Sequence, residues 1–206
     1  MMGRVAPLLL LMGLTASGAW SQQGERRAEP PPAPAAARAV ARLFTADQLM
    51  FLSHMIVHHE QALEMAAMVP SRSQREDFIR YARYLDGAQR VEIDQMKGLL
   101  HLASERGLEI PRHDMTGDPP MSGMLSRAQM ATLAAARGAE FERLWLQGMI
   151  YHHEGGLAMA REQQERQFER GRQTYGIDVL VDDIIEVQRA EVTKMKTWLT
   201  RWGLEP

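Results

Sequence analysis

Residues 55–66 read M-I-V-H-H-E-Q-A-L-E-M-A, and residues 149–160 read M-I-Y-H-H-E-G-G-L-A-M-A, identical at eight of twelve positions. A second pair follows, Q-R-V-E-I-D-Q-M-K-G-L-L at 89–100 and Q-R-A-E-V-T-K-M-K-T-W-L at 188–199, with six identities in twelve. The offsets are 94 and 99 residues, so the five extra residues fall between the two motifs, where insertions are tolerated. Such spacing indicates a duplicated structural unit.

Periodicity and capping predict that each repeat is a pair of helices. Thr45 with Gln48 forms a capping box, the apolar residues behind it recur with a helical period, and Pro70 ends this helix. We expect the second helix to begin at Ser73 and to run to about Glu105.

The second half repeats this pattern. Ser126 with Gln129 forms a capping box, and we expect one helix from there to about Phe168 with a bend at Gly138. A last helix is expected over about 178–202. Two such hairpins bury their apolar stripes against each other as a four-helix bundle. The sequence therefore predicts an all-α protein made of two duplicated helical hairpins.

The first residues of the sequence suggest export. Arg4 precedes an apolar run at 5–14, about half the length of a membrane span, and mostly small residues follow up to Ser21. We expect a periplasmic or secreted protein that makes no membrane contact after signal cleavage. The predicted organisation is signal peptide 1–21, Pro/Ala-rich linker 22–43 and four-helix domain 44–206, the last comprising repeat one at 44–107, a Met-rich loop at 108–125 and repeat two at 126–204.

Composition narrows the possible functions. The chain has no cysteine, which removes thiolate metal sites and cysteine nucleophiles, and its net charge of −2 provides no basic surface for nucleic acid. No catalytic triad, phosphate loop or nucleotide motif is visible, so we expect no enzyme activity. Methionine is abundant, with 15 residues.

The first motif places soft ligands on one helix face. At about 100° per residue, His59 lies about 40° from Met55 on the apolar stripe, and His58 lies about 20° from the direction of Met65. The same spacing recurs at Met149, His152, His153 and Met159.

The second motif adds a thioether and a carboxylate to each hairpin. One face carries Gln89, Glu92 and Met96, and its counterpart carries Gln188, Glu191 and Met195. Thioethers suit Cu(I), imidazole suits copper in both oxidation states, and buried imidazoles need partners for their lone pairs. Either Glu60 and Glu154 or Glu92 and Glu191 are expected to accept a hydrogen bond from the far ring nitrogens. The predicted ligands of a copper ion are Met55, His58, His59, Met65, Met96, Met149, His152, His153, Met159 and Met195.

Other residues of these types have open roles. His54 precedes His58 by four residues, but its equivalent in the second half is Gly148. The loop residues Met115, Met121 and Met124 form either an auxiliary soft site or an apolar lid. His101 and His113 are expected to be solvated.

The patterns M-x-x-H-H-x-x-(A/G)-L-x-M-A and Q-x-x-E-(I/V)-x-x-M resemble the domain-of-unknown-function family 305 over about residues 44–202. The resemblance implies a ferritin-like four-helix bundle, typically exported in bacteria, with some copper-binding members. It also implies that the histidines and methionines of both motifs are the ligands. Gly155 and Gly156 replace Gln61 and Ala62 in the second half, which we expect to loosen that helix.

Three functions are compatible with the sequence. The first is an exported protein that buffers Cu(I) or Cu(II), or delivers it to another periplasmic copper protein. The second is a ferritin-like di-metal oxidoreductase. Such a centre requires four carboxylates and Glu-x-x-His pairs, and no Glu-x-x-His occurs in this sequence. The third is a metal-free structural or interaction bundle, in which glutamates satisfy the histidines and methionine fills the core.

Overall fold

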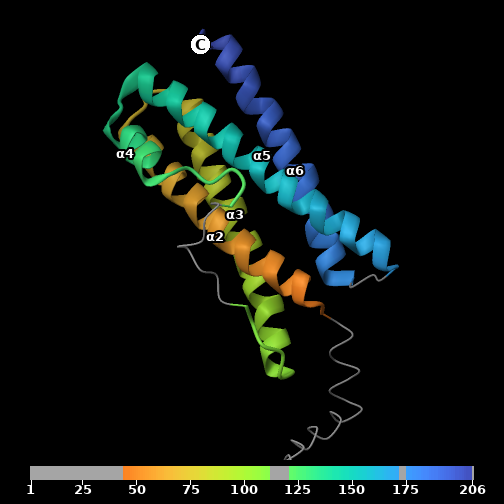
Figure 1. The fold of residues 1–206 in the computed structure, drawn as a ribbon. Helices are drawn as coiled ribbons and strands as arrows, with labels where there is room; N and C mark the ends of the chain where they lie inside the picture. The colour runs from red at the N-terminus through yellow and green to blue at the C-terminus, as the bar shows by residue number, and fades with distance from the viewer. Residues whose placement is uncertain (1–43, 112–120, 172–174, 206) are drawn as a thin grey trace, which may run out of the picture. The chain divides into compact units, whose positions relative to one another are not determined.

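The computed structural model describes residues 44–111, 121–171 and 175–205, and every regular element in these ranges is helical (Figure 1). The predicted signal peptide and linker, residues 1–43, lie outside the described residues. The all-helical fold with four long helices is confirmed. These helices are α2 (Ala46–Met68), α3 (Glu76–Glu105), α5 (Gly138–Arg170) and α6 (Tyr175–Arg201), accompanied by the 3-10 turn η1 (Val69–Ser71) and the short helix α4 (Arg127–Ala135).

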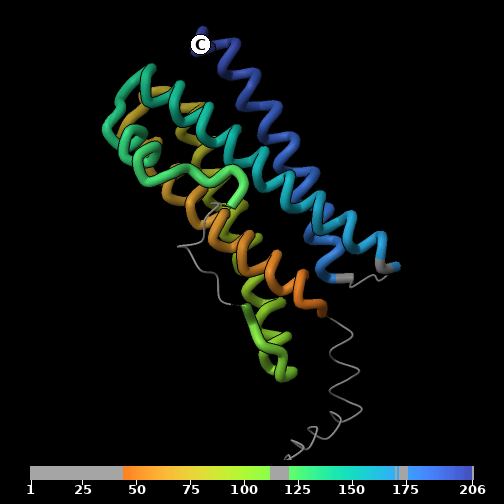
Figure 2. Tube along the Cα trace, viewed as in Figure 1, coloured from red at the N-terminus to blue at the C-terminus, as the bar shows by residue number. Residues whose placement is uncertain are grey.

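The long helices pair as two hairpins. Helix α2 packs along α3, and α5 packs along α6 (Figure 2). The hairpins meet mainly through α2 and α5, whereas α3 and α6 contact each other at few positions. None of the described helices combines the length and the hydropathy of a membrane span.

Both predicted capping boxes are present. Thr45 Oγ1 accepts a hydrogen bond from the Gln48 amide at 3.2 Å, and Gln48 Oε1 accepts one from the Thr45 amide at 2.9 Å. Ser126 and Gln129 exchange the same two bonds at 3.2 and 2.7 Å. Each box satisfies amide groups that have no partner in the first helical turn.

The predicted start of α3 at Ser73 is wrong. The helix begins at Glu76 with Arg75 as its N-cap. The Ser73 hydroxyl accepts from the Arg75 amide at 3.1 Å and donates to Glu142 of α5 at 2.6 Å. Arg75 also donates to Glu142, at 2.8 Å. The hydroxyl therefore ties the two hairpins together instead of capping a helix.

The single helix predicted from Ser126 to Phe168 is divided into α4 and α5. Ala136 and Arg137 are extended, and Gly138 has a φ of +56°, a value that favours glycine. The Gly138 amide donates to the Arg72 carbonyl at 3.0 Å, and the Arg137 guanidinium bonds to carbonyl groups at the end of α4. Contacts with the first hairpin thus interrupt the helix before Gly138, where the sequence predicts only a bend.

The buried core consists of two apolar clusters. The tryptophan cluster contains Phe78, Trp145 and Trp198 among its largest members, and the isoleucine cluster contains Ile56, Ile93, Ile177 and Ile184. Along α2 the isoleucine cluster ends at Ile56 and the tryptophan cluster begins at Ala62, with buried histidines between them. On α3 and α6 the buried amides Gln89 and Gln188 take the equivalent places. A polar layer therefore lies between the two clusters along α2, α3 and α6.

Candidate metal centre

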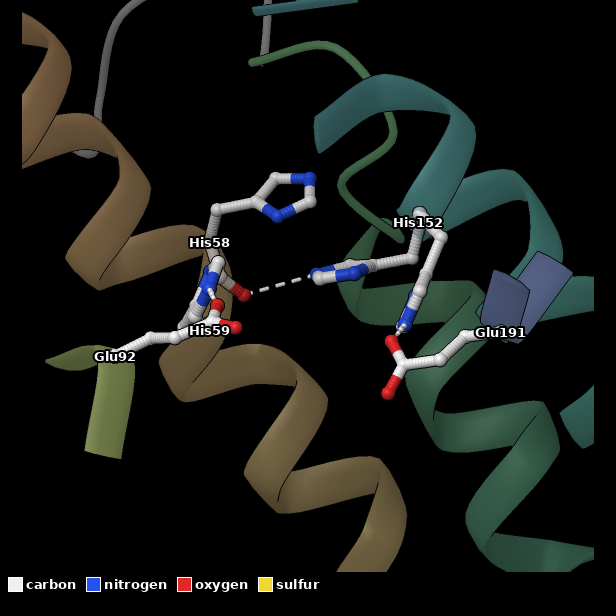
Figure 3. Close-up of polar contacts among 6 residues, drawn as sticks. His58, His59, Glu92, His152 and Glu191 are labelled. Atoms are coloured by element: carbon white, nitrogen blue, oxygen red, sulfur yellow. Dashed lines mark hydrogen bonds and ion pairs between the residues drawn. The ribbon is translucent and has the colours of Figure 1, made fainter. Parts of the chain in front are cut away.

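The four histidines of the duplicated motif lie in this polar layer. The exposed fraction is 0% for His58, His59 and His153 and 1% for His152. In Figure 3 the side chains of His58 and His152 lie between the two helices, with Glu92 and Glu191 on opposite sides. The four imidazoles are therefore buried, as the helical periodicity of the sequence predicts.

The rings of His58 (α2) and His152 (α5) lie against each other in a tilted arrangement. Their centroids are 3.7 Å apart and their planes are inclined by 31°. His58 Nε2 donates to the Ser122 carbonyl at 3.1 Å, and His152 Nε2 donates to the His58 carbonyl at 2.9 Å. Because a carbonyl oxygen can only accept, Nε2 carries the proton in both rings, and Nδ1 holds a lone pair.

The other two histidines each bond to a glutamate of their own hairpin. His59 Nε2 donates to Glu92 at 2.6 Å, and His153 Nε2 donates to Glu191 at 2.9 Å. A carboxylate on the far nitrogen fixes the orientation of the ring and makes the remaining nitrogen a better metal ligand.

The glutamates next to the histidines in sequence have a different role. Glu60 and Glu154 are exposed, and they pair with Lys97 at 3.5 Å and Lys196 at 2.7 Å. Of the two acceptor pairs considered from the sequence, Glu92 and Glu191 are therefore the ones that contact the rings.

The unpartnered polar atoms of the layer are acceptors. Within the described part of the chain, no hydrogen-bond partner reaches Nδ1 of any of the four histidines. The same holds for the buried oxygens Gln89 Oε1, Gln188 Oε1 and Glu191 Oε1. Buried polar atoms in native proteins are nearly always satisfied, so this concentration of acceptors suits a positively charged ligand.

Burial keeps the imidazole rings of His58 and His152 neutral. It lowers the pKa of His58 to about 3, assisted by repulsion from His59 and His153 and opposed by the hydrogen bond to Ser122. Burial likewise lowers the pKa of His152 well below the usual histidine value. Neutral imidazole is the form that binds a metal ion, so no proton has to leave these rings at neutral pH.

This burial predicts that the metal-free protein loses stability in acid. Between pH 6.5 and about 3, the unfolded chain takes up a proton at His58 whereas the folded chain does not, and His152 acts in the same direction. The free energy of unfolding is therefore expected to fall as pH drops, by roughly 1 kcal/mol per pH unit from His58, with His152 adding to the fall. Urea unfolding at neutral and mildly acid pH measures this slope. A double variant His58→Gln/His152→Gln with the slope of the wild type would exclude these rings as its cause.

The predicted methionine ligands lie in the clusters on the two sides of the layer. Met55 and Met96 belong to the isoleucine cluster, and Met65, Met149 and Met195 belong to the tryptophan cluster, all with an exposed fraction of 0%. Met159 differs, because it is only partly buried and lines a surface pocket. The structure thus buries the four imidazoles in one polar layer and places five thioethers in the adjoining apolar clusters.

Histidine and carboxylate alone do not complete a metal site. Among the described residues, no three His, Asp or Glu side chains converge where they could hold one ion. A centre with three or more ligands at the buried imidazoles would therefore need donors of another kind. Thioether sulfur is the donor that the flanking clusters supply.

The segment 121–125 docks against α5 beside the histidines, a feature that the sequence did not reveal. Gly123 has a φ of +80°, and a Cβ atom there would lie 2.6 Å from the His152 carbonyl oxygen. A Cβ atom on Gly155 would collide with the backbone of Ser122 and Gly123. This close approach brings the Ser122 carbonyl to His58.

Two further contacts hold this segment and the layer in place. The Gln61 amide exchanges two hydrogen bonds with the backbone of Leu125, at 2.8 and 2.9 Å. A Cβ atom on Gly156 would lie 2.6 Å from Gln188 Oε1 and 3.2 Å from His58 Cε1. The glycine pair does not loosen α5, which runs unbroken through it. Its small size makes room for the docked segment and for the polar layer.

The residues with open roles have different surroundings. His54 is partly buried and lines a pocket, and Met121 and Met124 are partly buried in the docked segment. His101 is exposed and lies 3.3 Å from Glu105. Met115 and His113 lie outside the described residues.

A family model for a domain of unknown function, DUF305, matches residues 48–199. The chain belongs to the DUF305 family. No curated protein matches this DUF305 chain.

Solved structures of the family resemble this DUF305 chain along most of its length. A candidate secreted DUF305 protein from Streptomyces coelicolor is 32% identical, covering 77% of this chain and 93% of its own, with a TM-score of 0.64. A DUF305 fragment from Deinococcus radiodurans is 30% identical, covering 76% and 97%, with a TM-score of 0.65. CopM in its Cu(I)-bound form is 26% identical, covering 75% and 96%, with a TM-score of 0.59. CopM has also been solved with Cu(II) and with silver.

Proposed function

We propose that this DUF305 protein is an exported copper-binding protein that buffers the ion or delivers it to a partner. The observation that carries the proposal is the set of four buried imidazoles whose Nδ1 atoms have no partner within the described part of the chain. Leaving such groups unsatisfied costs about 1–3 kcal/mol each. A bound cation removes that cost.

The donor types favour a soft ion. Imidazole nitrogen and methionine sulfur together suit Cu(I), and imidazole alone also suits Cu(II). In this assignment His58, His59, His152 and His153 supply nitrogen, while Glu92 and Glu191 hold two of the rings in position. Sulfur comes from the predicted methionine ligands, Met55, Met65, Met96, Met149, Met159 and Met195. The copper-bound and silver-bound forms of CopM, a structural relative, support the same ion class.

The di-metal oxidoreductase has less support. Ferritin-like di-metal centres use four carboxylates and two Glu-x-x-His pairs. Here only two glutamates bond to the buried histidines, and the described residues contain no larger group of acidic and histidine ligands. Export is supported by the signal-like start of the sequence and by the candidate secreted relative from Streptomyces coelicolor.

Competitive titration against a Cu(I) chelator tests the proposal in the wild type and in Glu92→Gln/Glu191→Gln. Glutamine keeps the size of the side chain but removes the charge-assisted bond to His59 and His153. The affinity for Cu(I) is expected to fall roughly 10- to 100-fold, as it does when a partner that orients a metal ligand is lost.

The matched control is Glu60→Gln/Glu154→Gln, which removes two exposed glutamates one residue away from the same histidines. This control is expected to retain the wild-type affinity. A wild-type protein that takes no Cu(I) from the chelator would contradict the proposal and leave the metal-free bundle as the function class.

A further inference from the structure

A second group of soft donors lines a surface pocket outside the polar layer. The pocket, of about 390 Å³, lies between the first turns of α2 and the later turns of α5. Met50 and His54 line it from α2, four residues apart and therefore on one helix face. Met159 lines it from α5. Met50 is 40% exposed, so its thioether is open to solvent.

The pocket also carries acidic residues. Asp47 and Glu162 line it together with the cation Arg166, which is paired with Glu162. Carboxylates at a pocket raise the local concentration of cations. Two thioethers and an imidazole together fit a soft monovalent cation better than a hard one.

The other half of the molecule supplies an internal comparison. At the offset of 94 residues, Leu144 corresponds to Met50 and Gly148 corresponds to His54. Both line a separate pocket against α4, and Met65, the counterpart of Met159, packs against Gly148 there. The fold therefore forms this part of α5 without a methionine or a histidine at these positions.

Met159 connects the pocket with the interior. It lines the pocket and also packs against the isoleucine cluster, which contains Met55 and Met96. It follows His152 by seven residues, which places the two side chains about 20° apart on α5, two turns from each other. Met159 thus lies between the pocket and the cluster that adjoins the buried layer, whose histidines have almost no exposure of their own.

We propose that Met50, His54 and Met159 form a second, solvent-accessible site for a soft monovalent ion, through which the ion reaches the buried histidines. The delivery step rests on the proposed copper-binding function. The surface site itself does not, because it can bind an ion when the buried layer does not.

Equilibrium dialysis with Ag(I) tests the site in the wild type and in Met50→Leu/His54→Ala. Leucine is the residue that the second half carries at the position of Met50. The variant is expected to lose one equivalent of Ag(I) and to load the remaining ions more slowly in a stopped-flow competition. The control Met68→Leu/His101→Ala removes a partly buried methionine and an exposed histidine elsewhere, and it is expected to match the wild type.

The outcomes separate the two proposals. A variant that binds as many Ag(I) equivalents as the wild type and the control overturns the surface site and leaves the proposed function intact. A variant that loses one equivalent but loads the rest at the wild-type rate overturns the delivery step. A wild type that binds no Ag(I) overturns both the surface site and the proposed function.

Discussion

Changing His58, His59, His152 and His153 together to glutamine is expected to reduce the affinity for Cu(I) by more than the roughly 100-fold that losing an orienting partner costs. The four rings carry the unpartnered Nδ1 atoms of the polar layer. Glutamine keeps much of the side-chain volume and a donor for the carbonyl and carboxylate acceptors, but it does not provide an imidazole lone pair. Competitive titration with a Cu(I) chelator measures the loss.

Folding has to be separated from binding in this variant. Far-ultraviolet circular dichroism of the metal-free protein checks that the helices of both hairpins are retained. A retained fold with unchanged Cu(I) affinity would mean that these imidazoles are not the ligands. The buried methionines would then have to bind the ion without them.

Replacing Gly155 with alanine is expected to have the opposite effect on stability from the same change at Gly98. Both glycines lie within helices, where alanine is favoured by about 1 kcal/mol. A Cβ atom at Gly98 meets nothing within 4 Å, so Gly98→Ala should stabilise the protein. At Gly155 the added atom collides with the backbone of Ser122 and Gly123. We expect a net loss of about 1–3 kcal/mol, the usual cost of overpacking.

Urea unfolding of the two metal-free variants gives this comparison directly. The displaced segment would also withdraw the Ser122 carbonyl that fixes the tautomer of His58. If Gly155→Ala raised stability as much as Gly98→Ala, the segment 121–125 would not be docked on α5 in solution.

The local pattern of the sequence was sufficient to predict the helices but not their breaks. Capping boxes at Thr45 and Ser126 depend on residues three positions apart, so they can be identified directly from sequence. The break before Gly138 depends on the Arg72 carbonyl, 66 residues earlier in the chain. The misassigned Ser73 likewise bonds to Glu142, 69 residues away. Contacts at such separations are set by packing and leave no local signal.

In the candidate site, too, some features follow from the local sequence and others depend on how the helices pack. Helical periodicity was enough to expect His58 and His59 on a buried face, because burial follows the apolar stripe. It did not decide whether Glu60 or Glu92 contacts the imidazole, since that depends on how α3 packs against α2. The ring contact between His58 and His152 depends on how α2 packs against α5 and was not predicted.

The glycine pair in the second half was the one available signal for the docked segment. Its departure from the first half was visible in the alignment of the two motifs. The interpretation was wrong because a glycine in a helix can serve a close approach as well as flexibility. At Gly155 the neighbour is backbone from a loop, which only the folded structure reveals.

The most direct measurement follows the ring nitrogens of the buried histidines by NMR while Ag(I), a diamagnetic substitute for Cu(I), is added. The account predicts that the Nδ1 signals of His58, His59, His152 and His153 shift as the ion binds, while their Nε2 atoms remain protonated. Uptake of Ag(I) with these four Nδ1 signals unmoved would contradict it.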